Sequence, residues 1–453
     1  MKLSDKTIGI IGLGKSGHGL IDYLNNKAKK VVAFDSKVEA KNNYDLDHYK
    51  NVDFHFGQNP RGDEEVDLII ISPGISLDHD FVQKFIQRGV EVIGEVELAF
   101  RLTAGSFIGI TGTNGKTTTT ALTGKMFKDA GRDPRIVGNI GNPIISEIES
   151  AGSNTVFVAE LSSFQLETAK NLRCKAATII NITPDHLDRH KTMENYGDIK
   201  AKIYQNQDNE DFAIINVDDP LSLALGEQTS AQKIYVSVSQ MLDGKKFPTN
   251  ISIQNNKIIL SKENQEFEII DLEDIPLKGK HNYENVLCAI GLALAYEIDI
   301  KSIALTLKHF TGVEHRLEFV RKVKEVSYIN DSKGTNPDAS IKALEAIEKD
   351  IILIAGGYDK NSNFDKLVSA FDQRVKLALI MGETKEKIKS SFKAQGFERY
   401  IEVKNMEEAV EMASKMAEEG DTVLLSPACA SWDMYTSFEQ RGEHFKALVD
   451  KLG

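Results

Sequence analysis

Three short apolar runs, each leading into a glycine-rich turn and then a helix-like stretch, constrain the fold more than any other feature of this sequence. The runs occupy residues 7–14, 107–115 and 351–357. Buried parallel strands have this pattern, because helices cover both faces of their sheet and the alternation of apolar and polar residues disappears. Similar runs predict further strands at residues 30–34, 66–72, 155–160, 176–182, 212–217, 326–330, 378–381 and 421–426.

Helix-like stretches separate these runs, so the sequence predicts repeated β-α-β units and an α/β fold. The 453 residues exceed what one hydrophobic core usually organises, and we expect three domains, at residues 1–105, 106–312 and 313–453. Strand-like pieces at 250–253 and 257–260 flank the pair Asn255-Asn256. This pattern is typical of a hairpin and predicts a small antiparallel appendage to the middle domain.

Charge and cysteine content exclude several classes of protein. The formal net charge of −12 would repel a polyanion, so we do not expect nucleic-acid binding. The cysteines Cys174, Cys288 and Cys429 are far apart and odd in number, which favours neither a disulfide framework nor a thiolate zinc site. No signal-peptide pattern and no apolar run of membrane-spanning length is present, so we expect a soluble, cytoplasmic protein. We separately expect a monomer.

A glycine-rich turn with a lysine follows the second apolar run. The segment Gly112-Thr-Asn-Gly-Lys116-Thr-Thr118 opens a helix directly after a strand. Backbone N–H groups of such a turn can cradle a polyphosphate, Lys116 can reach its terminal phosphates, and Thr117 can hold Mg²⁺. The strict phosphate-loop pattern would require glycine where the chain has Ile110. The alternative is an ordinary turn with a solvated lysine.

The first apolar run ends in a dinucleotide-like motif. Gly12, Gly14 and Gly17 have the spacing GxGxxG, and Asp35 ends the next predicted strand. This geometry binds the diphosphate of a dinucleotide at a helix N-terminus, and it can equally bind a nucleoside diphosphate. The residues alone do not choose between NAD and a UDP derivative.

Acidic and histidine side chains follow two strands of the middle domain. Glu160 ends one predicted strand and His186 follows the next, at the sheet edge where ligands of α/β proteins bind. Both side chains are candidate Mg²⁺ ligands beside ATP. The alternative is that Glu160 and Asp185 cap the helices after them, with His190 on a solvated loop.

A predicted helix at residues 194–206 carries Lys200 at the edge of its apolar stripe of Tyr196, Ile199 and Ile203. From this pattern alone, we expect a lysine whose stem packs on the protein while its ammonium remains in water.

Together these segments resemble the successive signatures of the Mur ligases, the ATP-dependent amide ligases of peptidoglycan synthesis. The motifs are Gly112-Thr-Asn-Gly-Lys-Thr-Thr, Glu160-Leu-Ser-Ser-Phe-Gln, Asp185-His-Leu-Asp-Arg, Lys280-His-Asn-Tyr-Glu-Asn285, His315-Arg-Leu-Glu and Asn330-Asp-Ser-Lys-Gly-Thr-Asn-Pro337. The resemblance spans essentially the whole chain and keeps the order of the motifs. Ser72-Pro-Gly74 and the segment from Leu425 to Glu443 most resemble the members of the family that add D-glutamate.

The resemblance implies an architecture and an activity. The expected parts are a Rossmann-like domain for the UDP substrate, a central P-loop ATPase-type parallel sheet, and a Rossmann-like C-terminal domain that closes over both. The expected reaction joins D-glutamate to UDP-N-acetylmuramoyl-L-alanine through an acyl phosphate and a tetrahedral intermediate, giving ADP and phosphate. Such a ligase supplies peptidoglycan precursors for cell-wall biogenesis, cell shape and cell division.

The resemblance also assigns residues. For ATP they are Gly112, Thr113, Asn114, Gly115, Lys116, Thr117, Thr118, Asn285, Arg316, Asp331 and Lys333. For the UDP substrate they are Gly14, Lys15, Ser16, Asp35, Ser36, Lys37, Ser72, Pro73, Gly74, Asn139 and Ser162. For D-glutamate they are His186, Thr335, Lys360, Ser431 and Phe438. For catalysis they are Lys116, Glu160, His186 and Lys200.

Two Mg²⁺ ions are implied, held by Thr117, Glu160, His186 and Lys200. In relatives the lysine that matches Lys200 is carbamylated by CO₂, which turns a cation into an anionic ligand. The alternatives for the other matched positions are structural: a polar turn at Asp331 and helix capping by Asn282 and Asn285. Relatives have Thr-Arg where this chain has Ser36-Lys37, so the planar fork of arginine is replaced by a point charge.

Four alternative functions remain open at this stage. Another amino-acid-adding Mur ligase shares the scaffold. Folylpolyglutamate synthetase shares the central fold but lacks the added domain at residues 1–100. An NAD-linked oxidoreductase would use the GxGxxG motif, although no hydride-transfer constellation accompanies it. A nucleotide-gated binding module would bind ATP without ligation.

Overall fold

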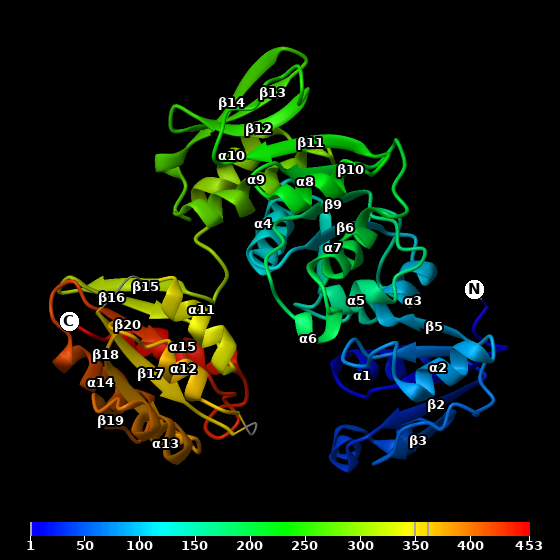
Figure 1. Cartoon of the computed structure of the whole chain (residues 1–453), viewed down its shortest axis with the longest axis horizontal. Coiled ribbons are helices and arrows are strands. Elements are labelled where there is room, and N and C mark those ends of the chain that lie inside the picture. Colours follow the sequence, from blue (N-terminus) through cyan, green and yellow to red (C-terminus); the bar gives the residue numbers. More distant parts are fainter. Residues whose placement is uncertain (1, 348–349, 360–361) are drawn as a thin grey trace. The chain divides into compact units, whose positions relative to one another are not determined.

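The computed structural model describes residues 2–347, 350–359 and 362–453. It divides into two compact units, Met1–Phe310 and Thr311–Gly453, and each is described by itself (Figure 1). Within the described residues the strands form three sheets, two in the first unit and one in the second. The prediction of an α/β fold with three sheet-based domains is confirmed.

The first sheet of unit one is entirely parallel, with strand order β3-β2-β1-β4-β5. Its strands are β1 (Thr7–Ile11), β2 (Lys30–Asp35), β3 (Val52–Phe56), β4 (Leu68–Ile71) and β5 (Glu91–Gly94). Its helices are α1 (Lys15–Leu24), α2 (Asp80–Gln87) and α3 (Glu95–Leu102). Ile10 and Ile11, which point to opposite faces of β1, are both buried, as expected for a central strand covered on both faces.

The second sheet of unit one has the order β14-β13-β12-β11-β10-β9-β6-β8-β7. Its strands are β6 (Ser106–Thr111), β7 (Asp133–Gly138), β8 (Thr155–Glu160), β9 (Ala176–Ile179), β10 (Phe212–Asn216), β11 (Gln232–Ser237), β12 (Thr249–Gln254), β13 (Lys257–Lys262) and β14 (Gln265–Asp271). From β7 at one edge to β12, each pair of neighbouring strands is parallel. At the other edge, β13 pairs antiparallel with β12, and β14 pairs antiparallel with β13. The predicted hairpin is confirmed, with Asn255 and Asn256 both at positive φ in its turn.

Helices cover both faces of this second sheet. They are α4 (Lys116–Asp129), α5 (Ser163–Glu167), α6 (Leu187–His190), α7 (Met193–Ala201), α8 (Pro220–Gly226), α9 (Lys280–Leu294) and α10 (Ile300–His309). One hydrophobic cluster runs without interruption from Ile8 in the first sheet through Val96 of α3 to Phe157 in the second. This shared core explains why both sheets belong to one compact unit.

Unit two contains a mixed sheet of order β15-β16-β20-β17-β18-β19, in which only the pairing of β15 with β16 is antiparallel among the strands described. Its strands are β15 (Glu318–Val323), β16 (Val326–Asn330), β17 (Ile351–Gly356), β18 (Val375–Met381), β19 (Tyr400–Glu402) and β20 (Thr422–Leu425). Its helices are α11 (Pro337–Glu345), α12 (Asp365–Ser369), α13 (Lys385–Gln395), α14 (Met406–Met416) and α15 (Phe438–Val449).

No helix in the described part of the chain has both the length and the apolar character needed to cross a bilayer. The predicted helix at 194–206 ends earlier than expected: α7 stops at Ala201, and a 3₁₀ turn follows at Lys202–Tyr204.

Candidate functional site

The glycine-rich turn between β6 and α4 is the centre of the candidate site. Gly115 adopts the left-handed conformation (φ 82°) immediately before the first residue of α4. A side chain there would collide with the amide of Asn285 on α9, so only glycine fits. Asn285 is buried within α9, whose N-cap is Gly279, and the alternative that Asn285 caps this helix is wrong. The structure thus brings a predicted ATP residue to the turn from a distant segment.

The end of strand β9 holds the turn in place. The backbone N–H of Thr113 donates to Asn181 O (2.9 Å), and the N–H of Asn114 donates to Asn181 Oδ1 (2.9 Å). Thr113 Oγ1 also accepts from the N–H of Thr183 (3.0 Å). Sequence reasoning missed Asn181, because the strand predicted at 176–182 included it, whereas β9 ends at Ile179. Asn181 therefore belongs to the scaffold that shapes the turn.

Two lysines converge on the turn. Lys116 Nζ donates to Gly112 O (2.9 Å) and Thr113 O (2.8 Å). Lys200 Nζ, from α7, also donates to Gly112 O (2.9 Å) and is 3.4 Å from Thr111 Oγ1. Two ammonium groups therefore share one carbonyl oxygen at the predicted phosphate site.

Lys200 is only 1% exposed, and its ammonium lies 4.6 Å from the centre of the Tyr196 ring. The expectation that this ammonium remains in water is wrong, because α7 packs its whole side chain against the turn. Burial, together with the charge of Lys116, lowers the pKa of Lys200 to about 7. A substantial fraction of the amine is therefore neutral near neutral pH.

Glu160 ends β8, beside the strand that leads into the turn. Its carboxylate is buried, and Oε1 accepts from Asn139 Nδ2 (2.8 Å). Within the described residues, Glu160 Oε2 has no hydrogen-bond partner although it is buried. The alternative that Glu160 caps α5 is wrong, because Ser162 is the cap and forms a capping box with Gln165.

His186 lies at the start of α6 in the left-handed conformation (φ 51°) and is itself the N-cap, so the alternative that Asp185 caps this helix is wrong. Its half-exposed ring is 4.8 Å from the ring of Phe164, and Nε2 is 3.6 Å from Asp185 Oδ2. Thr117 is buried in the first turn of α4. The unpaired, buried oxygen of Glu160 fits Mg²⁺, which prefers oxygen ligands.

His190 departs from the expectation of a solvated loop. It is 1% exposed, with Nε2 2.9 Å from Ser163 Oγ and Nδ1 3.5 Å from Glu167 Oε1. Its ring stacks on Tyr196 at 5.1 Å between centroids. Burial lowers the pKa of His190, which favours the neutral form of the ring, although the charge of Glu167 acts in the opposite direction.

A cavity of about 470 Å³ lies at the N-terminus of α1, where the GxGxxG motif ends. Its lining consists of Leu13, Gly14, Lys15, His18, Gly19, Asp22, Asn43, Pro143 and Ser146. Of the predicted UDP-substrate positions, all of which are described, only Gly14 and Lys15 line it. Lys15 Nζ donates to Gly141 O (2.5 Å), a contact between the two sheets of unit one.

Asp35 ends β2, as predicted, and it supports the backbone of the nearby turns. Its Oδ2 accepts from the N–H of Leu13 (2.7 Å) and its Oδ1 from the N–H of Lys37 (2.8 Å). Ser72 packs against Gly12 and leaves no room for a side chain there. The φ of Gly12, +93°, is also one that residues other than glycine rarely adopt. The loop at residues 72–74 therefore lies against the first glycine of the motif.

In unit two, the predicted ATP position Asp331 follows β16 and is buried. Its Oδ2 accepts from Ser426 Oγ (2.7 Å), and its Oδ1 accepts from the N–H of Leu317 (3.3 Å). Burial raises the pKa of Asp331 to about 6. The segment does form a turn, closed by the N–H of Gly334 on Asp331 O (2.8 Å). Of the other predicted ATP positions in unit two, Arg316 is exposed and Lys333 is half-buried.

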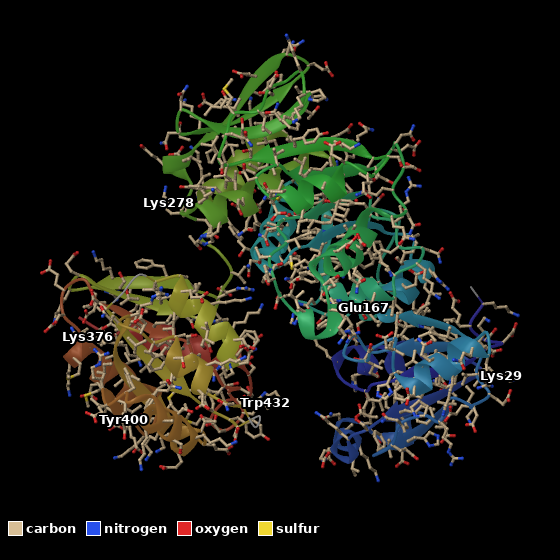
Figure 2. All side chains as sticks on the ribbon, viewed as in Figure 1. Lys29, Glu167, Lys278, Lys376, Tyr400 and Trp432 are labelled. Atoms are coloured by element: carbon tan, nitrogen blue, oxygen red, sulfur yellow. The ribbon has the colours of Figure 1, made fainter. Side chains whose placement is uncertain are left out.

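Of the predicted D-glutamate positions, His186 lies in unit one, and Thr335, Ser431 and Phe438 come from three segments of unit two. Ser332 Oγ donates to Phe438 O (2.8 Å), which joins the segment after β16 to the start of α15. Ser431 is buried after β20, next to the exposed Trp432 that is labelled in Figure 2. Thr335 is half-buried in the same segment as Asp331. Lys360 lies outside the described residues.

Sequence reasoning missed Arg441, a fully buried guanidinium of α15. It donates to Ser332 Oγ (2.9 Å), Ser332 O (2.8 Å) and Cys429 O (3.1 Å). Burial lowers the pKa of Arg441 to about 10. This side chain ties together the segments after β16 and β20 that carry the predicted ligand residues.

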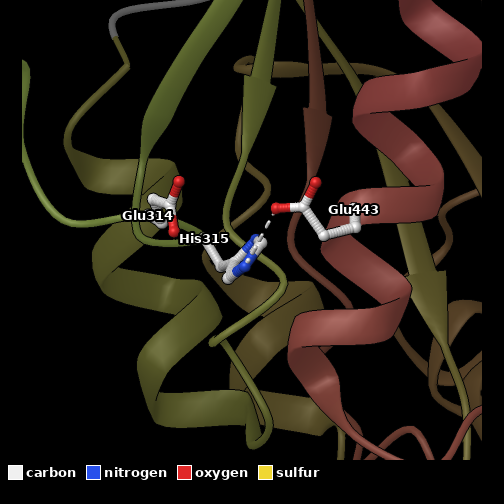
Figure 3. Close-up of side chains that lie close together, drawn as sticks. All are labelled: Glu314, His315 and Glu443. Atoms are coloured by element: carbon white, nitrogen blue, oxygen red, sulfur yellow. Dashed lines mark ion pairs between the residues drawn. The ribbon is translucent and has the colours of Figure 1, made fainter.

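Figure 3 shows Glu314, His315 and Glu443, whose side chains lie close enough together to suggest a cation site. His315 Nε2 is 3.6 Å from Glu443 Oε1. The ammonium of Lys446 contacts Glu443 (3.1 Å), Glu318 (3.0 Å) and Glu314 (3.7 Å). A positive charge of the chain itself therefore balances these carboxylates.

Family models match the chain in three consecutive parts. The model described as Mur ligase MurD-like, N-terminal domain, matches residues 6–94. The Mur ligase middle domain matches residues 110–293, and the Mur ligase glutamate ligase domain matches residues 315–429.

Curated relatives match over the full length. A UDP-N-acetylmuramoylalanine–D-glutamate ligase of Alkaliphilus metalliredigens is 44% identical and covers 100% of this chain and 99% of its own. The enzyme of the same name from Clostridioides difficile is 45% identical and covers 100% of both chains.

Solved structures share the fold at low identity. A pseudomurein peptide ligase type C from Methanothermus fervidus has a TM-score of 0.53 and 18% identity, with 99% of this chain and 100% of that chain covered. A UDP-N-acetylmuramate-alanine ligase from Thermotoga maritima has a TM-score of 0.54 and 18% identity, with 98% and 99% covered.

Proposed function

The chain belongs to the Mur ligase family, and from this premise we propose that it joins D-glutamate to UDP-N-acetylmuramoyl-L-alanine at the expense of ATP. The observation that carries the proposal is the full-length identity of 44–45% to ligases with this name. The product is a peptidoglycan precursor. The convergence of Lys116, Lys200 and Asn285 on one glycine-rich turn supports an ATP-dependent reaction at that turn.

The chemistry divides into activation and condensation. A carboxylate is a poor electrophile, so the alanyl carboxylate of the substrate first attacks the γ-phosphorus of ATP, and ADP leaves. The amine of D-glutamate then attacks the acyl phosphate, and phosphate leaves from a tetrahedral intermediate. The protein has mainly to position anions and offset their charge.

Lys116 is the proposed phosphate ligand. Its ammonium already lies on the carbonyl oxygens of the turn, 2.9 Å from Gly112 O and 2.8 Å from Thr113 O. Phosphate oxygens of ATP would take the place of these carbonyl acceptors. The start of α4 adds backbone N–H groups and the positive end of the helix dipole.

Thr117, Glu160, His186 and a carbamate on Lys200 are the proposed groups that hold two Mg²⁺ ions. The unpaired Glu160 Oε2 supports this, because a buried carboxylate oxygen without a partner is costly unless a ligand satisfies it. Bound there, Mg²⁺ would offset the negative charge that develops on the transferred phosphoryl group.

Carbamylation of Lys200 is part of the proposal. The neutral amine adds to the carbon of CO₂ and releases a proton, which leaves an anionic carbamate. The burial of Lys200 and its pKa of about 7 support this, because the neutral amine is the reactive form. An unmodified ammonium would instead repel a metal ion.

We assign substrates to the domains predicted at 1–105, 106–312 and 313–453. The first would bind the UDP moiety through Gly14, Lys15, Ser16, Asp35, Ser36, Lys37 and Ser72 to Gly74. Asn139 and Ser162, which lie in the second domain, would contact the muramoyl end of the same substrate. The second would bind the phosphates of ATP. The third would bind the rest of ATP through Arg316, Asp331 and Lys333, and D-glutamate through Thr335, Lys360, Ser431 and Phe438.

Phosphate release measured across D-Glu, L-Glu, L-Ala, L-Lys and meso-diaminopimelate tests the proposal. We expect release only when ATP, UDP-N-acetylmuramoyl-L-alanine and D-Glu are present together. Stimulation by another amino acid would move the chain to a different subclass of the family. Release without any amino acid would indicate an ATPase, and no release with any of the amino acids would indicate a binding module; either result would contradict ligation.

A further inference from the structure

Arg189, the residue before His190 in α6, connects the two sheets of unit one. Its Nη1 donates to Pro73 O (3.0 Å) and its Nη2 to Ile75 O (3.1 Å). On its other side, Nε and Nη2 donate to the two carboxylate oxygens of Glu167 at 3.0 and 2.5 Å. Its guanidinium also lies over the Phe164 ring at 4.5 Å. One side chain thus joins the loop after β4 to the end of α5, where Figure 2 labels Glu167.

Burial makes this connection specific. The side chains of Arg189 and Glu167 are 16% and 11% exposed, so water screens their attraction only weakly. The planar guanidinium of Arg189 donates to the carboxylate of Glu167 on one side and to two backbone carbonyl oxygens on the other. Lysine has the same charge but not this geometry.

The loop held by Arg189 lies against the motif that ends the first apolar run. The N–H of Ser72 donates to Ile11 O (2.8 Å), and the Cβ of Ser72 fills the space beside Gly12. The N–H of Ile75 closes the loop on Ser72 O (2.9 Å). The Arg189 bonds to the carbonyls on either side of Gly74 therefore fix the loop that we assign to the UDP substrate.

The other end of the connection leads to the phosphate turn. Glu167 contacts the ring of His190, which stacks on Tyr196. The hydroxyl of Tyr196 is 3.4 Å from Thr113 Oγ1, and its ring lies beneath the ammonium of Lys200. Packed side chains thus run without a gap from the substrate loop to the turn.

We propose that Arg189 is a positioning residue that sets where the carboxylate of the UDP substrate lies relative to the phosphate turn. This inference rests on the proposed function and deepens it, because an acyl phosphate forms only if the attacking carboxylate lies in line with the γ-phosphate. A displacement of about 1 Å costs roughly 100-fold in rate in reactions of this kind. Arg189 itself touches neither reacting atom in this assignment.

The test compares Arg189→Lys and Glu167→Gln with a matched control, Arg101→Lys. Arg101 is 17% exposed and pairs with the buried Glu97 at 2.8 Å, so it reproduces the burial and pairing of Arg189 away from the substrate loop. Kinetic constants for each substrate and the melting temperature are measured for every variant. KM is measured separately for ATP and for the UDP substrate. A positioning role should affect the constants for the UDP substrate alone, whereas general instability should affect both substrates.

We expect Arg189→Lys and Glu167→Gln each to lower kcat/KM for UDP-N-acetylmuramoyl-L-alanine by roughly 10- to 100-fold, with KM for ATP unchanged within about twofold. The double variant should lose no more than the worse single variant, because both changes break one connection. Arg101→Lys should lose melting temperature to a similar degree yet retain kcat/KM within about twofold. Equal kinetic losses in Arg189→Lys and Arg101→Lys, or near-normal kinetics in Arg189→Lys, would overturn the proposal.

A second readout separates this inference from the proposed function. Hydrogen exchange at the amides of Ser72 and Ile75 should accelerate in Arg189→Lys and not in Arg101→Lys, because only the first variant releases the loop. If the wild-type protein fails to ligate D-glutamate, the proposed function is wrong whatever this exchange shows. Unchanged exchange in Arg189→Lys would instead refute the positioning role in an active ligase.

Discussion

Lys116 and Lys200 donate to the same carbonyl oxygen, that of Gly112, at 2.9 Å each. Two cations so close to one acceptor are unfavourable unless an anion or a change of protonation relieves them. ATP would supply the anion for Lys116, and carbamylation would remove the positive charge of Lys200. The relationship between these two side chains therefore leads to two separate predictions.

Lys116→Ala should fold normally and lose turnover. The ammonium is the cationic side chain proposed to meet the γ-phosphate, and removal of one such group from a preorganised site costs roughly 100- to 1000-fold in kcat. Lys125→Ala, on the exposed side of the same helix, is the control, because its partner Asp129 lies at the surface. Near-normal phosphate release by Lys116→Ala, with a melting temperature like that of Lys125→Ala, would contradict the assignment.

Lys200 should carry a carbamate in the presence of bicarbonate and Mg²⁺. With ¹³C-labelled bicarbonate, we expect a carbamate carbon resonance that is absent from Lys200→Arg. Lys202→Arg is the matched control, since Lys202 is also partly buried and burial lowers its pKa as well, but its ammonium donates to Glu167 O, away from the turn. A resonance that persists in Lys200→Arg would assign the modification to another amine.

Sequence patterns predicted the central strands of each sheet well. The expected strands at 155–160 and 326–330 match β8 and β16 at both ends. Every residue of β8 is buried, and β16 lies between two neighbouring strands, β15 and β20. The edge strand β7 was missed, since Asp133 and Pro134 break its apolar pattern. Pairing with β8, not the local sequence, makes this segment a strand.

Some residues of the candidate site could be predicted from the sequence and others could not, because long-range packing decides the environment of the latter. Residues that follow buried strands, such as Glu160, could be identified from position alone. The burial of His190 and Lys200 could not, because it comes from packing against Tyr196 and the turn, which local polarity does not reveal. Arg189 was likewise missed, since its partners lie in two other segments of the chain, the loop after β4 and the end of α5.

Gly115→Ala should impair the protein more than Gly131→Ala. Both glycines have positive φ, 82° and 72°, so both substitutions cost about 1–2 kcal/mol in backbone conformation. A methyl group at Gly131 enters open space, whereas one at Gly115 meets the Asn285 amide. We expect a larger loss of unfolding free energy and no measurable ATP binding for Gly115→Ala. Equal stabilities and affinities for the two variants would contradict the close packing of the turn on α9.

Glu95→Gln should stabilise the protein, and increasingly so as pH rises. Glu95 is 3% exposed at the start of α3, and burial raises the pKa of its carboxyl to about 7. Between the unfolded value of 4.5 and about 7, the folded state retains a proton that the unfolded state loses, so wild-type stability falls with rising pH by up to about 3 kcal/mol. Glutamine cannot ionise and still offers an oxygen to the N–H of Ile145, which Glu95 Oε1 accepts at 2.7 Å.

Glu97→Gln, two residues along the same helix, should behave in the opposite way. Burial opposes its ionisation, but hydrogen bonds from the backbone of Lys170, from Arg101 and from Asn171 outweigh burial and lower its pKa. Its contribution to stability is therefore present above the unfolded pKa and is lost as pH falls through the folded value. Urea unfolding of both variants, from well below the unfolded glutamate pKa of 4.5 up to pH 8, checks the pair. Parallel pH profiles for the two variants would show that burial does not control Glu95.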